Sequence, residues 1–142
     1  MTDLGALVIM LRATGSLTIR PNMGRAAQQL CLGIIHEADA ALADELHDTS
    51  QVKPYAVSGL LLPDSTRPVE GTIAPGDPAW VRLVGLRADV VTALDKSISD
   101  PRVFAPGERD QLPANKRPAV WKEDGITFVQ FNYDRWIVES FT

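Results

Sequence analysis

The chain contains only two histidines, His36 and His47, and both lie in one stretch of helical hydrophobic spacing. An imidazole titrates near neutral pH, so either side chain could give or take a proton in catalysis. His47 stands at the end of the helical pattern, and Lys53 follows it by six residues. A lysine there could supply fixed positive charge to an anion such as a phosphate. Asp44 and Asp48 could orient the His47 ring. The spacing is compatible with an acid–base site for a phosphate-bearing substrate.

A structural role is also open for these residues. His47 could cap the C-terminus of its helix through the helix dipole, with Lys53 as solvated surface. His47 lies eleven positions after His36, and in a continuous helix this separation corresponds to about 16.5 Å, which is too far for a shared reaction. His36 can therefore join His47 only if the helix bends near Ala38 or Asp39; otherwise it is a surface residue.

Other chemistries have less support. The single cysteine, Cys31, is expected in the core, and there is no CxxC or HExxH pair for zinc. No metal or cofactor is expected, although a Mg²⁺ site made from scattered carboxylates stays open. Neither GxxxxGK[ST] nor GxGxxG occurs, and Ser58 lacks the GxSxG setting of a nucleophile elbow. Arg20 and Arg25 bracket the expected start of the first helix, where backbone N–H groups favour anions. They are candidate phosphate-binding residues, as a local RNA or DNA site would need.

Composition limits the classes of protein. With 142 residues, 45% hydrophobic and 23% charged, the chain suits a single domain that does not span a membrane. The start lacks a basic region and a cleavage site, so secretion is not expected, and one cysteine fits a reducing, cytoplasmic compartment. The net charge of −4 gives no global attraction to nucleic acid. An RNA site must therefore be local.

The hydrophobic pattern predicts the elements that position these residues. A near-continuous apolar run over 5–13 predicts a central strand buried on both faces. A helical region follows over 23–47, interrupted near Ala38 and Asp39, then strands over 55–62 and 79–86, a helix over 88–98 and a hairpin around residues 132–134. The proline-rich stretches 63–78 and 101–118 are expected as loops. This order predicts an α+β, ferredoxin-like β-α-β-β-α-β fold with an antiparallel sheet and both helical regions on one face.

Three segments in this order resemble a known family. They are GRAAQQLCLGIIHEADAALADELHD, KPYAVSGLL and WVRLVGLRADVVTAL. Together they are similar to the N-terminal half of the CRISPR-associated repeat-RNA endoribonucleases of the RAMP superfamily, the Cas6 type. In that family a helix ends in an L-H-[DE/N] element, followed by a K-P-[FY]-x-x-S strand. The resemblance covers residues 5–98 and, loosely, the final hairpin.

The resemblance implies a function and a site. Family members process CRISPR precursor RNA within its repeats, as part of antiviral defence. They need no metal, and they use 2′-hydroxyl attack, which leaves a 2′,3′-cyclic phosphate. By position, His47 matches the catalytic histidine as proton shuttle, and Lys53 matches the lysine that stabilises the phosphate and contacts RNA. A tyrosine used by some members falls near Leu32 here, so that role is vacant or filled by His36.

Length is where the chain departs from the family. Family proteins carry a second ferredoxin-like domain with a glycine-rich loop, and neither occurs in these residues. We therefore expect residues 1–142 to be a single N-terminal RAMP domain, from a truncated or a split protein. The implied partners are CRISPR repeat RNA and, as further options, an effector complex or a second copy in a homodimer. Two alternatives stay open: a non-catalytic RNA-binding or scaffold subunit, and an unrelated ferredoxin-like module for small ligands or dimerisation.

Overall fold

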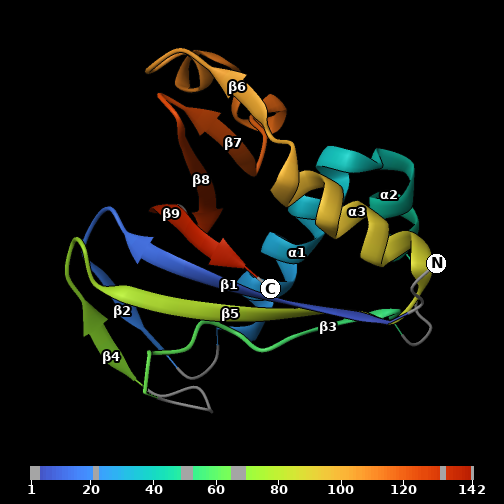
Figure 1. Cartoon of the computed structure of the whole chain (residues 1–142), viewed down its shortest axis with the longest axis horizontal. Helices are drawn as coiled ribbons and strands as arrows, with labels where there is room; N and C mark the ends of the chain where they lie inside the picture. Colours follow the sequence, from blue (N-terminus) through green and yellow to red (C-terminus); the bar gives the residue numbers. More distant parts are fainter. Residues whose placement is uncertain (1–3, 21–22, 49–52, 65–69, 132–133, 142) are drawn as a thin grey trace.

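One curved seven-stranded sheet organises the molecule (Figure 1). The computed structural model describes residues 4–20, 23–48, 53–64, 70–131 and 134–141. The strands of this sheet, in spatial order, are β3 (Tyr55–Val57), β5 (Pro78–Gly85), β1 (Gly5–Ala13), β9 (Asp134–Phe141), β8 (Ile126–Phe131), β7 (Val120–Glu123) and β6 (Arg102–Phe104). Neighbouring strands are antiparallel except for β6 and β7. A two-stranded sheet of β2 (Leu17–Ile19) and β4 (Gly71–Ile73) adjoins them.

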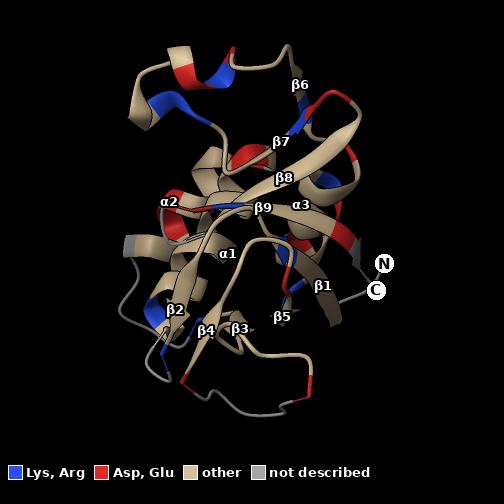
Figure 2. Cartoon of the chain, turned by 90° about the vertical axis from the view of Figure 1, so that its left-hand side faces the viewer, with Lys and Arg blue, Asp and Glu red and all other residues tan. Residues whose placement is uncertain are grey.

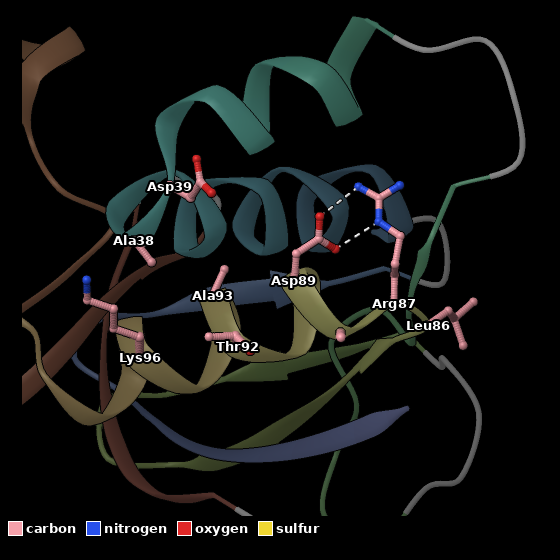
Figure 3. Close-up of a pocket in the computed structure, with 9 residues that line it drawn as sticks. Ala38, Asp39, Leu86, Arg87, Asp89, Thr92, Ala93 and Lys96 are labelled. Atoms are coloured by element: carbon pink, nitrogen blue, oxygen red, sulfur yellow. Dashed lines mark hydrogen bonds and ion pairs between the residues drawn. The ribbon is translucent and has the colours of Figure 1, made fainter. Parts of the chain in front are cut away.

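The ferredoxin-like prediction is confirmed by the spatial order of four strands. Strands β3, β5, β1 and β9 lie side by side, as the second, third, first and fourth strands of a β-α-β-β-α-β unit do. The helical regions occupy the two crossover positions: α1 (Gly24–Ala38) with α2 (Ala40–Asp48), and α3 (Ala88–Ser99). All three helices lie on the same side of the sheet, as expected, with α2 packed on α1 (Figure 1 and Figure 3). None of the helices in the described ranges is long and apolar enough to cross a membrane.

The expectation that the first strand is buried on both faces is wrong. On β1, Ile9 and Leu11 are fully buried, whereas Val8 and Met10, which alternate with them, are half-buried. Successive side chains of a strand point to opposite faces, and the helices cover only one face of this sheet. The apolar residues on the other face are therefore partly exposed.

Three further expectations need correction. The strand expected over 55–62 is regular only at β3, because Gly59 has a φ of 79° and the Ser58 hydroxyl accepts the Arg82 N–H at 2.9 Å. Pairing resumes at Leu61, which bridges Trp80. The loop expected over 63–78 contains β4, and the stretch 101–118 contains β6 and two short 3₁₀ turns. The hairpin near the end of the chain is confirmed as β8 and β9, while Asn132 and Tyr133 at its turn lie outside the described residues.

Asp39 produces the predicted interruption of the helical region. Its N–H donates to the Ile35 carbonyl at 2.9 Å and so ends α1, while its backbone is extended, with φ −155° and ψ 90°. Its carboxylate then accepts the Leu42 N–H at 3.0 Å, and its carbonyl accepts the Ala43 N–H at 3.1 Å. A carboxylate that accepts a first-turn N–H is a standard helix N-cap. One residue therefore ends one helix and begins the next.

Candidate active site

The last turn of α2 presents His47 to solvent. Leu42, Ala43 and Leu46 are the buried residues of this helix, and they pack into the core cluster that includes α1. His47 falls outside that buried stripe and is exposed. Within the described residues, its imidazole makes no hydrogen bond or ion pair. The Asp48 side chain, expected to orient the ring, lies outside what the structure describes, and Asp44 is exposed.

Lys53 lies against the end of the same helix. Its ammonium group donates to the Leu46 carbonyl at 2.5 Å. It therefore satisfies one of the carbonyl acceptors that a helix C-terminus leaves unpaired. The side chain is half-buried. Leu46 directly precedes His47, so the structure brings the two predicted residues to one turn of helix.

The segment after Lys53 is tied to the start of α3. The Pro54 carbonyl accepts the Leu86 N–H at 2.8 Å, and Tyr55 pairs with Gly85. These contacts place Arg87, the residue before α3, beside the Lys53 segment. Sequence reasoning missed Arg87 because only the pairing of β3 with β5 brings these distant positions together.

Arg87 is held by two carboxylates. Its Nε and Nη2 donate to the two oxygens of Asp89 at 2.8 and 3.0 Å, and Nη2 lies 3.7 Å from Glu45 of α2. The hydrogen bond with Asp89 raises the pKa of Arg87, and the same bond lowers the pKa of Asp89. A second cation therefore contacts the helical turn that carries His47.

Among the described residues, no contact links His36 to His47. His36 is exposed on the last turn of α1, within one turn of Asp39, whereas His47 lies eight residues after Asp39. Those eight residues correspond to about 12 Å along α2. Figure 3 shows α2 turning back along α1 from Asp39. The predicted bend is present, but the two imidazoles lie toward opposite ends of α2.

Arg20 and Arg25 are both exposed, and residues 21–22 between them are not described. Arg25 lies one turn before Gln28, whose side-chain amide donates to the Tyr55 hydroxyl at 2.9 Å. That bond ties the first turns of α1 to the strand that follows Lys53. No hydrogen bond or ion pair of the described residues links Arg25 or Arg20 to His47.

A large cavity adjoins this site through Arg87 and does not include His47 among its lining residues. It has a volume of about 770 Å³ and lies between α3 and the junction of α1 with α2, with Arg87 at one end and Lys96 at the other (Figure 3). Asp39 and Asp89 also line it. No histidine lines this cavity, so the predicted acid–base residue lies outside it.

Metal and thiol chemistry find no site in the described residues. They contain no group of three or more His, Cys, Asp or Glu side chains that could hold a metal ion. Cys31 is fully buried, as expected, and burial raises the pKa of its thiol to about 12. It is a packing residue. Basic and acidic positions are interspersed over the molecule (Figure 2), so any RNA-binding cation must act locally.

Comparisons with known proteins give matches among solved structures. No family model matches the chain, and no curated protein does. A CRISPR associated protein Cas6 structure superposes with a TM-score of 0.55 at 13% identity, over 99% of this chain and 48% of that one. A Cas6 product complex gives a TM-score of 0.44 at 21% identity, over 71% of this chain and 35% of that one. The chain spans about half the length of the first structure (48%). It has a Cas6-like, ferredoxin-like fold.

Proposed function

We propose that this chain is a Cas6-type domain that processes CRISPR precursor RNA as a metal-independent endoribonuclease. One observation carries the proposal. The His47 imidazole is exposed, and the carbonyl of the preceding residue, Leu46, accepts a hydrogen bond from the Lys53 ammonium group at 2.5 Å. The Cas6-like fold supports the assignment to RNA processing. The positions of His47 and Lys53 also agree with the family motifs in the sequence.

The reaction needs proton transfers and charge stabilisation. The 2′-hydroxyl attacks the adjacent phosphorus, its proton leaves to a base, and the bond from phosphorus to the 5′-oxygen breaks. The 5′-oxygen takes up a proton, which leaves a 2′,3′-cyclic phosphate and a 5′-hydroxyl. His47 serves as the proton shuttle in these transfers. The positive charge of Lys53 stabilises the negative charge that grows on the phosphoryl oxygens.

The main competing function is that of a non-catalytic RNA-binding or scaffold subunit. The contact of Lys53 with a helix-end carbonyl also suits a residue that only stabilises α2. In that case wild-type protein would retain repeat RNA and yield no product. Loss of Lys53 would then weaken binding alone.

Cleavage of a labelled repeat RNA in the presence of EDTA tests the proposal. Wild-type protein is expected to cut the RNA to a 2′,3′-cyclic phosphate, and not to cut a substrate with a 2′-deoxynucleotide at the cleavage site. His47→Ala should abolish cleavage and keep RNA affinity within a few fold. Lys53→Ala should slow cleavage, whereas Lys122→Ala on β7 carries the same charge change and should not. Cleavage by His47→Ala at the wild-type rate would overturn the assignment.

His36 and Arg25 are proposed only as secondary residues. His36→Ala should lower the cleavage rate less than His47→Ala, since no contact ties His36 to the α2 terminus. Arg25→Ala and Arg20→Ala should weaken RNA retention. A homodimer or an effector complex as partner is a further proposal, which size-exclusion chromatography with and without RNA would test.

A further inference from the structure

We propose that Arg87 binds a backbone phosphate of the RNA next to the scissile phosphate. When RNA is absent, the carboxylates of Asp89 and Glu45 pair with the Arg87 guanidinium group instead. This inference rests on the proposed function, because it adds a residue to the same site. Arg87 is not part of the sequence motifs that identify His47 and Lys53. Its position comes from tertiary contacts alone.

The first argument is convergence on one helical turn. Arg87 reaches Glu45, with Nη2 at 3.7 Å from the carboxylate, and Lys53 reaches the carbonyl of Leu46 at 2.5 Å. Glu45 and Leu46 are the two residues before His47. Two cations from separate segments therefore contact consecutive residues of the turn that presents the imidazole. An RNA strand at His47 would pass both.

The second argument is the geometry of the ion pair. Two nitrogens of Arg87 bind the two oxygens of Asp89 at 2.8 and 3.0 Å, which is a bidentate pair (Figure 3). A guanidinium group binds two phosphate oxygens with the same fork, so the Asp89 carboxylate occupies the place that a phosphate would take.

The third argument is exposure. The side chains of Arg87, Asp89 and Glu45 are 44%, 48% and 62% exposed. Exposed ion pairs contribute little to stability because water and salt screen them. Exchange of a carboxylate for a phosphate therefore costs little.

The neighbouring cavity limits where the phosphate lies. Asp39, Asp89 and Lys96 are among the residues that line it. These carboxylates would repel a phosphate deep in the cavity. The phosphate is therefore expected at the rim, on the side of Arg87 that faces Glu45 and α2.

The test is equilibrium binding of a fluorescent single-stranded repeat RNA to the full chain at several salt concentrations. Removing one cation that pairs with a phosphate lowers the slope of log affinity against log salt by about 0.7 for a single strand. Arg87→Ala should weaken binding several-fold at low salt and lower the slope by that amount. Glu45→Gln removes a competing carboxylate and should strengthen binding. Arg82→Ala removes the same charge from the face of β5 that the helices leave uncovered, and it should leave the slope unchanged.

Two further variants keep the test valid if Arg87→Ala does not fold. Arg87→Lys keeps the charge without the fork and should give intermediate affinity. Asp89→Asn keeps an oxygen for the Val90 N–H, which Asp89 accepts at 2.8 Å, and should strengthen binding. Wild-type RNA affinity in Arg87→Lys and Arg87→Ala, with an unchanged salt slope in Arg87→Ala and His47-dependent cleavage intact, would overturn this inference alone. Wild-type protein that neither binds nor cleaves repeat RNA would overturn the proposed function and this inference together.

Discussion

At the scale of single residues, the chain uses arginines in two distinct ways. Arg87 is exposed and its partners are carboxylates, whereas Arg109 is buried and its main partner is a backbone carbonyl. The Arg109 side chain donates twice to the Pro118 carbonyl, at 2.9 and 2.8 Å, and its guanidinium group lies 3.7 Å from the centre of the Trp121 ring. Burial lowers the pKa of Arg109, and Asp110 opposes that effect. Arg109 fixes the segment before β7 onto the sheet.

Removal of Arg109 should therefore destabilise the fold. Arg109→Ala leaves the Pro118 carbonyl and one face of Trp121 without their partner, and we expect the free energy of unfolding to fall by about 2 to 4 kcal/mol. Arg117 also donates to two carbonyls but is exposed, so Arg117→Ala should cost less than about 1 kcal/mol. Urea unfolding followed by tryptophan fluorescence measures both values. An equal loss of unfolding free energy in Arg109→Ala and Arg117→Ala would show that the buried position of Arg109 does not make its contacts more stabilising.

At the scale of elements, α3 lies unusually close to the central strands. A Cβ atom added to Gly85 would meet Val91 side-chain and backbone atoms at 2.8 and 3.1 Å, and one on Gly5 would meet Val91 at 2.9 Å. Gly5 and Gly85 are paired across β1 and β5. The two glycines let the helix approach the sheet at the strand end that leads to Arg87. The same contact therefore also helps to position the candidate site.

Gly85→Ala should push α3 away from the sheet. Overpacking of this kind costs about 1 to 3 kcal/mol, and the displaced Arg87 should also reduce RNA affinity. Gly15→Ala is a matched control, because nothing lies within 4 Å of its added Cβ. Thermal unfolding and RNA binding of the two variants provide the measurement. Wild-type stability in Gly85→Ala would contradict the close packing.

At the scale of the whole molecule, β9 joins two parts of the sheet. It pairs with β1 on one side and with β8 on the other, so the ferredoxin-like strands and the strands β6 to β8 share one ladder. Trp136 of β9 and Val129 of β8 belong to the same core cluster as Ile9 and Ile34. The last third of the chain is therefore part of the main core.

A single cooperative unfolding transition is expected from this arrangement. Far-ultraviolet circular dichroism reports the helices, while tryptophan fluorescence reports Trp80, Trp121 and Trp136 on β5, β7 and β9. Because these strands lie in one sheet, the two signals should change at the same urea concentration. Transitions at different urea concentrations would show that the strands β6 to β8 unfold separately.

The regular elements and their order can be read from the sequence alone. Helical spacing marked α1, α2 and α3, and Asp39 marked the break between the first two, because these signals depend on neighbours a few residues apart. The position of His47 at a helix end and the order of elements in the ferredoxin-like core follow from the same local information. Short strands such as β4 and β6 carry few residues and lie in proline-rich stretches, so no periodic pattern revealed them.

Which distant residues come into contact depends on the tertiary fold. The position of Arg87 next to the segment that starts at Lys53 depends on the pairing of Tyr55 with Gly85, thirty positions apart in the chain. The exposure of Val8 depends on the sheet face that the helices leave uncovered, and the contact of Arg109 with Trp121 depends on how the segment before β7 folds back. Such contacts are set by sheet register and by the packing of distant segments, and neither quantity can be read from the spacing of residues along one segment.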